Sequence, residues 1–231
     1  MTSEIAVPVV TVDGPSGSGK GTVSRLLAQR TGWHLLDSGA LYRLVAYAGR
    51  LAGLGNDDTD GHIRLAAQMQ VVFESDERGE RILLDGREVS AALRDEVIGA
   101  GASRVAAWGQ LRAVLLDRQH AAARAPGLIA DGRDMGTVVF PGARLKIFLT
   151  ATAAERARRR YNQLKEKDSG VSLAALSREI AERDRRDATR LVAPLVPAPD
   201  AIVLDSTTLR AAEVADRIVA YGHARGLWSG Q

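Results

Sequence analysis

The sequence predicts an α/β fold built on a five-stranded parallel sheet. Short apolar runs rich in β-branched residues, typical of strands buried on both faces, alternate with longer segments of helical periodicity. Such alternation implies right-handed crossover connections, which place successive strands parallel in one sheet. The 231 residues suit one globular domain with insertions and can bury a substantial core.

Five segments carry the strand pattern: residues 7–14, 34–39, 128–131, 145–149 and 201–205. Helices are predicted at residues 20–30, from Ser38 to 52, from about 61 to 69, and at 95–107, 110–124, 152–167, 172–187 and 209–224. Residues 70–86 alternate around a turn, which predicts a hairpin inserted between the second and third strands. The Arg-rich pair of helices forms a second insertion, before the fifth strand.

Composition excludes several classes of protein. The chain has no cysteine, which excludes disulfides and thiolate chemistry. The N-terminus carries an acid at Glu4 and no basic region, unlike a secretory signal, and no apolar run approaches the roughly 20 residues of a membrane span. We therefore expect a cytoplasmic protein without membrane segments.

Positive charge is concentrated in one segment. The chain carries a net charge of +3, whereas residues 151–190 alone hold 11 basic and 7 acidic residues, a net of +4. A local basic segment favours a polyphosphate partner over the broad positive face that nucleic acid requires. A solvated, ion-paired helix surface explains the same charges without any partner.

Residues 14–22 read GPSGSGKGT, directly after the first strand and at the start of the first helix. They resemble the phosphate-loop (P-loop) pattern G-x-x-x-x-G-K-[ST], with Gly21 at the position of the hydroxyl residue and Thr22 one place later. The glycines permit positive φ, so that successive N–H groups and the helix N-terminus point at one phosphate, which Lys20 also reaches. The strand before and the helix after distinguish a P-loop from a simple Gly-rich turn.

Charged residues follow the third strand at the edge where ligands bind in such sheets. Asp131 ends an apolar run and is a candidate for holding Mg²⁺ or its waters, although Asp205 ends a similar run. Arg133 and Asp134 come next, and Ser38 and Arg43 leave the second strand at the same edge. We expect these side chains to face one another, although a solvated loop would also account for the charges.

The stretch ERDRRDATR places Arg183, Asp187 and Arg190 at i, i+4 and i+7, which is one face of a helix if the helix continues that far. Ion pairs within the helix explain this spacing without a function. Several arginines on an inserted segment also suit phosphoryl transfer, in which the protein mainly positions and neutralises charged oxygens.

Taken together, GPSGSGKGT, LDSGALYR, IADGRDMGTVVFP, ERDRRDATR and APLVPAPDAIVLDST resemble the bacterial cytidylate kinases, (d)CMP kinases of the nucleoside-monophosphate kinase group. The resemblance implies a P-loop NTPase-like three-layer fold with a monophosphate-binding insertion and a helical lid. The implied division is a core of residues 1–37, 126–150 and 191–231, an insertion at 38–125 and a lid at 151–190. The implied reaction converts ATP and CMP or dCMP into ADP and CDP or dCDP, with Mg²⁺.

The same resemblance assigns residues. The implied catalytic residues are Lys20, Arg133, Arg183 and Arg186. The implied ATP-binding residues are Gly14, Pro15, Ser16, Gly17, Ser18, Gly19, Lys20, Gly21 and Thr22. The implied CMP-binding residues are Ser38, Tyr42, Arg43, Ser103, Arg112, Arg133, Asp134, Arg183, Asp187 and Arg190. Asp131 as a residue that holds the metal through water is inferred from its strand alone.

Cytosine suits Asp134, because a carboxylate accepts a hydrogen bond from the 4-amino group but faces the uracil oxygen unpaired. We expect a monomer that binds ATP and CMP or dCMP and neither nucleic acid nor membrane. Two alternatives stay open. One is a P-loop kinase of another small acceptor such as UMP; the other is a non-catalytic nucleotide-binding or RNA-binding module, which the 4% aromatic content disfavours.

Overall fold

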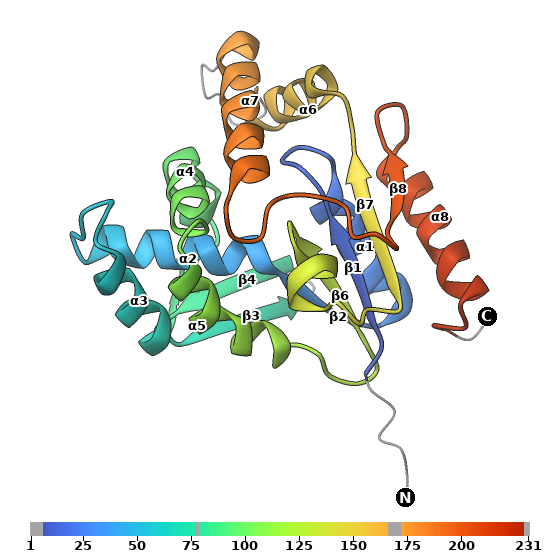
Figure 1. Cartoon of the computed structure of the whole chain (residues 1–231), viewed down its shortest axis with the longest axis horizontal. Helices are drawn as coiled ribbons and strands as arrows, with labels where there is room; N and C mark the ends of the chain where they lie inside the picture. The colour runs from blue at the N-terminus through green and yellow to red at the C-terminus, as the bar shows by residue number, and fades with distance from the viewer. Residues whose placement is uncertain (1–6, 77–78, 166–171, 229–231) are drawn as a thin grey trace, which may run out of the picture. The chain divides into compact units, whose positions relative to one another are not determined.

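The computed structural model describes residues 7–76, 79–165 and 172–228 (Figure 1). The tip of the predicted hairpin, 77–78, and the segment 166–171 of the predicted lid lie outside these residues. The chain forms two compact units, one of residues 1–37 with 119–231 and one of residues 38–118. The predicted division into core, insertion and lid stays a prediction.

The first unit contains the predicted sheet. Its strands are β1 (Val9–Asp13), β2 (His34–Asp37), β6 (Leu128–Gly132), β7 (Leu145–Thr150) and β8 (Ile202–Asp205). They are all parallel, in the order β2-β6-β1-β7-β8. The central strands β1 and β6 are buried along their whole length, whereas the edge strand β8 leaves Val203 half exposed. The fold class predicted from the sequence is confirmed.

Alternate residues of β1 face different layers. Val10 and Val12 pack in the hydrophobic core with Leu27 of α1 (Lys20–Thr31) and Ile218 of α8 (Ala211–Ala224). Because side chains alternate along a strand, the residues between them point to the other face. There Asp13 contacts η2 (Met135–Val139), a π-helical turn that the sequence did not predict.

The Arg-rich helices of the first unit are α6 (Ala153–Lys165) and α7 (Leu173–Thr189), which pack against each other (Figure 1). The Ser172 hydroxyl caps α7 by accepting a hydrogen bond from the Ala175 N–H at 3.2 Å. The helix predicted at residues 172–187 is confirmed, and it does not continue as far as Arg190, which follows its last residue. The chain turns back after Thr189, and the Leu195 N–H donates to the Asp187 carbonyl at 2.8 Å, which ends the helix.

The second unit holds most of the segment between β2 and β6. Its elements are α2 (Ser38–Leu51), α3 (Thr59–Gln68), β3 (Val71–Asp76), β4 (Gly79–Leu84), β5 (Arg87–Glu88), η1 (Ala92–Arg94) and α4 (Glu96–Val105), and α5 (Gly109–His120) begins in it. The hairpin is confirmed as β3 and β4, and β5 adds a third antiparallel strand. Ser38 is the first residue of α2 rather than its cap.

The helix expected at 110–124 ends earlier, at His120. Short turn bonds, such as Ala123 N–H to the His120 carbonyl, replace helical bonds beyond it. Among the described residues, no helix combines the length and the apolar character needed to cross a bilayer.

Candidate functional site

The P-loop connects β1 to α1 in the first unit. Gly14, Gly17 and Gly19 have φ values of 152°, 78° and 90°, the positive range that favours glycine. A side chain at Gly14 would overlap the Leu149 carbonyl of the neighbouring strand. Since α1 begins at Lys20, the free N–H groups of its first turn adjoin the loop, as an anion site requires.

Carboxylates from adjacent strands surround Lys20. Asp131 lies opposite Asp37 in the pairing of β6 with β2, and both interact with the Lys20 ammonium. Burial lowers the pKa of Lys20, and Arg133 lowers it further, while Asp131 raises it. Burial likewise raises the pKa of Asp131, and Lys20 opposes that rise. Lys20 and Asp131 therefore stabilise each other's charge in a site where water is scarce.

Gly21 faces this carboxylate. A Cβ added at Gly21 would lie 3.3 Å from Asp131 Oδ2. Most P-loops carry a hydroxyl at this position, whereas here the Asp131 oxygen occupies the adjoining space.

Arg133 and Asp187 form an ion pair between the end of β6 and α7. Arg133 Nε donates to Asp187 Oδ2 at 3.0 Å, and Arg133 also donates to the Gly132 carbonyl. Burial alone would raise the pKa of Asp187, but Arg133, Arg190 and Arg183 together lower it. The predicted residues Arg133, Arg183, Asp187 and Arg190 thus share one electrostatic cluster, although Arg190 lies beyond the helix. Arg183 also lowers the pKa of Lys20, which links the cluster to the loop.

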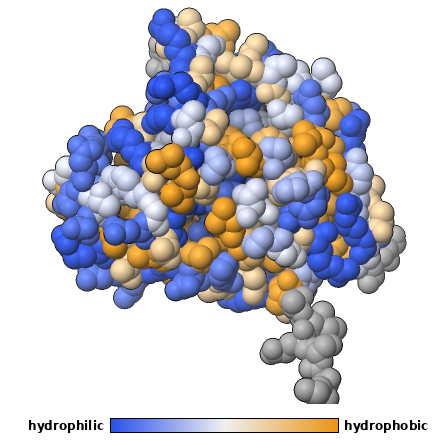
Figure 2. Space-filling model, viewed as in Figure 1, coloured by the Kyte–Doolittle hydropathy of each residue, from blue (hydrophilic) through white to orange (hydrophobic). Residues whose placement is uncertain are grey.

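Arg186, a predicted catalytic residue, points along its own helix. Its Nε lies 3.7 Å from Glu182 Oε1, one turn before it. Glu182 also bonds the exposed Arg185. In the space-filling view, hydrophilic residues gather over α7, so part of the Arg-rich segment is a solvated surface (Figure 2).

Asp134 is held by a residue that sequence reasoning missed. The Asp13 carboxylate accepts hydrogen bonds from the Met135 and Gly136 N–H groups, both at 2.8 Å. The Asp134 carbonyl in turn accepts from the Val138 N–H, and the Asp134 side chain is buried. Asp13 ends the apolar run of β1, and this position next to the loop was the available signal.

The second unit collects the remaining predicted residues. Tyr42 lies on α2, and the Arg112 guanidinium of α5 stands 5.5 Å from the centre of its ring. Arg43 donates to the Leu93 carbonyl at 2.7 Å and lies against α4 at Gly99. Ser38 and Ser103 are buried on α2 and α4, two helices that pack together. Each unit thus brings its own share of the predicted residues together.

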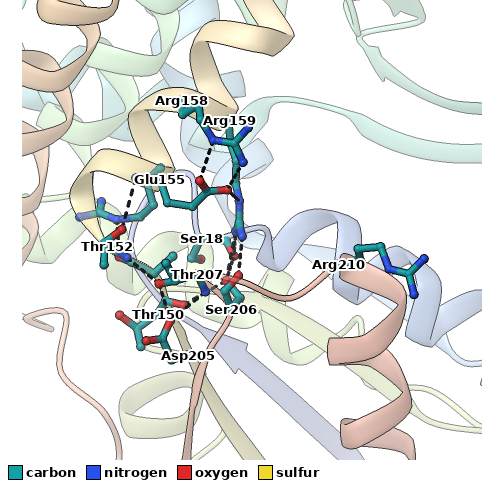
Figure 3. Close-up of polar contacts among 12 residues, drawn as sticks. Ser18, Thr150, Thr152, Glu155, Arg158, Arg159, Asp205, Ser206, Thr207 and Arg210 are labelled. Atoms are coloured by element: carbon teal, nitrogen blue, oxygen red, sulfur yellow. Dashed lines mark hydrogen bonds and ion pairs between the residues drawn. The ribbon is translucent and has the colours of Figure 1, made fainter.

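Sequence reasoning also missed a set of contacts behind the loop. Arg156 of α6 donates to the Ser16 carbonyl at 3.1 Å and forms a two-pronged ion pair with Asp184 of α7. Arg159 donates to the Ser18 carbonyl, also at 3.1 Å, and to Ser206 beyond β8 (Figure 3). The charge excess of the Arg-rich segment was visible in the sequence, but not these backbone partners.

A five-stranded parallel sheet, a P-loop with its lysine and a cluster of arginines at the same edge define a P-loop phosphotransferase. Comparisons with known proteins narrow the class. The family model described as cytidylate kinase matches residues 10–224. The chain belongs to the cytidylate kinase family.

Two bacterial relatives are similar over most of the chain. A protein named cytidylate kinase from Stutzerimonas stutzeri is 58% identical over 216 residues, 93% of this chain and 94% of the relative. Another of that name, from Pseudomonas savastanoi, is 56% identical over 97% of this chain and 99% of the relative. A crystal structure of an uncharacterised protein from Eubacterium ventriosum shares the fold, with a TM-score of 0.50, 11% identity, and coverage of 94% of this chain and 98% of that chain.

Proposed function

We propose that this chain transfers the γ-phosphoryl group of ATP to CMP and dCMP, yielding ADP and CDP or dCDP. The observation that carries the proposal is its 58% identity, over 93% of its length, to a protein named cytidylate kinase. The P-loop geometry and the arginine cluster supply the chemical support, because phosphoryl transfer depends on positioning and charge stabilisation.

The donor side rests on the loop. Backbone N–H groups of the loop, residues 14–22 apart from Pro15, and the N-terminus of α1 bind the ATP phosphates, and Lys20 reaches the β and γ oxygens. Lys20 Nζ donates a hydrogen bond to the Pro15 carbonyl at 3.3 Å, which orients the side chain along the loop. Its charge also interacts with Asp131 and Asp37, so binding exchanges these partners for phosphate oxygens.

The transferring group is assigned to the arginines. Arg133 and Arg183 both interact with Lys20, so their charge is directed to the region next to the loop. Arg186 joins them when its weak pairing with Glu182 at 3.7 Å is exchanged for a phosphate oxygen. These residues stabilise the negative charge that spreads over the equatorial oxygens during transfer.

The acceptor side divides between base, ribose and phosphate. Ser38, Arg112, Asp134 and Arg190 are assigned to cytosine, Ser103, Arg183 and Asp187 to the ribose, and Arg43 and Arg133 to the acceptor phosphate. Tyr42 is assigned to CMP without a particular group. The Arg133–Asp187 ion pair then opens on binding, because Arg133 turns to the phosphate and Asp187 accepts from a ribose hydroxyl.

The residues present fit Mg²⁺. The buried Asp131 carboxylate adjoins Gly21 at the start of α1, and oxygen donors of this kind suit the ion. Groups of three or more metal-ligating side chains are absent from the described residues. When bound, Mg²⁺ neutralises charge on the ATP phosphates, and Asp131 would hold it through water.

A coupled assay of ADP release with CMP, dCMP, UMP, AMP and GMP tests the proposal. We expect CMP and dCMP to be used far better than the other three. Preference for UMP or another acceptor would indicate a different P-loop kinase. Absence of ADP with every acceptor, together with tight and salt-sensitive RNA binding, would indicate a binding module instead.

We also propose that the chain is a cytoplasmic monomer that binds neither nucleic acid nor membrane. Its net charge outside residues 151–190 is −1, which does not provide a broad basic surface. Light scattering at micromolar concentration measures its mass, and a dimer mass would contradict the monomer.

A further inference from the structure

A side chain of α6 binds the backbone of the P-loop. Gly19 brings its backbone close to this helix, since a Cβ there would lie 3.5 Å from an Arg159 nitrogen. Arg159 Nη1 donates to the Ser18 carbonyl at 3.1 Å. The Ser206 hydroxyl, which follows β8, lies 2.9 Å from the same carbonyl oxygen (Figure 3). One loop carbonyl therefore faces two donors from segments far apart in the sequence.

The orientation of this carbonyl fixes the direction of an amide. Ser18 C=O and Gly19 N–H belong to one planar peptide, and in a trans peptide the two bonds point in opposite directions. Holding the carbonyl toward α6 and Ser206 therefore directs the Gly19 N–H away from them, to the other side of the loop. Amides on that side are the groups that a P-loop offers to phosphate.

Further hydrogen bonds fix both donor residues, Arg159 and Ser206. Arg159 is fixed by Glu155, whose carboxylate accepts from Arg159 Nε at 2.8 Å, and by the Ser206 backbone carbonyl. Ser206 is fixed by its own N–H, which donates to the Thr150 carbonyl at 2.8 Å. Next to it, Thr207 Oγ1 accepts from the Thr152 N–H at 3.0 Å (Figure 3). The ends of β7 and β8 and the first turns of α6 are thus joined at the back of the loop.

We propose that Arg159 and Ser206 are positioning residues that preorganise the P-loop for phosphate by holding the Ser18 carbonyl. The proposal deepens the proposed function, on which it rests, since it concerns how the same loop binds its donor. Arg159 acts through the peptide and contacts no substrate. Binding then depends on the triphosphate and is independent of the base attached to it.

The two donors are partly redundant. A hydroxyl has one proton, and Ser206 Oγ lies 3.0 Å from the Thr150 carbonyl as well as near Ser18, so it donates to one of them at a time. Arg159 alone or Ser206 alone can still hold the Ser18 carbonyl. Loss of both leaves this buried acceptor without either bond, which costs more than the two single losses together.

The experiment measures dissociation constants by calorimetry for ATP, GTP and inorganic tripolyphosphate, each with Mg²⁺. The variants are Arg159→Met, which keeps the apolar stem, Ser206→Ala and the double variant. Arg158→Met is the matched control, because Arg158 is 62% exposed and bonds Glu155 in the same helix. Turnover with CMP gives KM and kcat, and thermal unfolding checks that each variant folds.

We expect Arg159→Met to weaken binding of all three ligands about 10-fold and Ser206→Ala about 3-fold. The double variant should lose clearly more than the product of these factors. KM for CMP should stay near the wild-type value in these variants. The control Arg158→Met should bind the three ligands as the wild type does. Arg159→Lys should recover part of the loss, since an ammonium can still donate to the carbonyl.

Two results would overturn the proposal. A loss with ATP that is absent with GTP and tripolyphosphate would mean that Arg159 contacts the base directly. A double variant that binds as the wild type does, or that loses only the product of the two single factors, would mean that the two donors do not jointly hold the Ser18 carbonyl. If the double variant unfolds, the loss of affinity that each single variant shows for the three ligands still tests the proposal. Because binding is measured without an acceptor, failure of CMP turnover in the wild type would refute the proposed function separately.

Discussion

At the scale of single residues, opposing electrostatic effects act on the charge of Lys20. Burial and the neighbouring arginines Arg133 and Arg183 disfavour its charge, whereas Asp131 and Asp37 favour it. ATP brings further negative charge to this point, so binding of the donor favours the charged form of Lys20. A lysine suits this position because its ammonium is a compact point charge.

We expect Lys20→Ala to lower kcat by at least about 100-fold, because charge stabilisation in the transition state is lost. Single-turnover measurements with saturating ATP and CMP give the rate. Lys165→Ala is the control, since Lys165 is exposed at the end of α6. Near-normal turnover in Lys20→Ala would contradict the assignment of the loop.

Asp134 is the residue that we propose selects cytosine over uracil. A polar site discriminates by about 10⁴ between groups that an apolar site separates by only about 10². We therefore expect Asp134→Ala to reduce the ratio of kcat/KM for CMP over UMP about 100-fold, with KM for ATP nearly unchanged. Steady-state kinetics with both acceptors measure this ratio. If it stays at the wild-type value, the base is read by other residues.

At the scale of secondary-structure elements, the contact between β1 and η2 sets where Asp134 stands. Asp13 accepts two backbone N–H bonds from the start of η2, and it does so from a buried position. Burial raises the pKa of Asp13 to about 6 even though these two bonds lower it. The charged carboxylate is therefore costly, and the pairing of its oxygens offsets part of that cost.

This environment gives the stability of the fold a pH dependence with a definite sign. Between pH 3.8 and about 6, the folded state keeps a proton on Asp13 that the unfolded state has lost. The Asp13 contribution to the free energy of unfolding therefore decreases as the pH rises through this window. In Asp13→Asn, which does not titrate, this contribution is absent.

Urea unfolding at pH values from 4 to 7 measures the effect. We expect the stability of the wild type, relative to Asp13→Asn, to fall as the pH rises from about 4 to 6 and then to level off. The variant also leaves one N–H of η2 facing an amide donor, which lowers stability by about 1–3 kcal/mol near pH 4. A difference between the two proteins that does not change with pH would contradict the raised pKa.

The elements that could be predicted from the sequence are those with a strong local pattern. Residues 9–13 and 128–132 are continuous apolar strands, and the helix that starts at Lys20 follows a glycine loop. The π-helical turn η2 depends on Asp13, which is 122 residues distant along the chain, and so has no local signal. The end of α7 likewise involves the later Leu195 N–H, so the local sequence could not decide whether the helix reaches Arg190.

At the scale of the whole molecule, the site of the first unit draws on segments that are distant in sequence. The loop at residues 14–22, Arg133 after β6, Arg159 of α6 and Ser206 after β8 all belong to it. The loop could be recognised because its chemistry requires a fixed spacing of glycines and a lysine. The bonds from Arg159 and Ser206 to the Ser18 carbonyl could not be predicted. Every residue has a backbone carbonyl, so the residue type does not reveal which one accepts a bond.

Binding to this unit should be visible in the stability of the molecule. A ligand that binds only the folded state, at 100 times its dissociation constant, stabilises by about 2.7 kcal/mol. For a chain of this length, that corresponds to an increase in Tm of about 5–10 °C. We expect a non-hydrolysable ATP analogue with Mg²⁺ to produce such a shift in scanning calorimetry, in the transition of the unit that contains the P-loop.

At the same analogue concentration, Lys20→Ala should show a much smaller shift, while Lys165→Ala should match the wild type. Equal shifts in all three proteins would mean that the analogue binds elsewhere and that the loop is not the donor site.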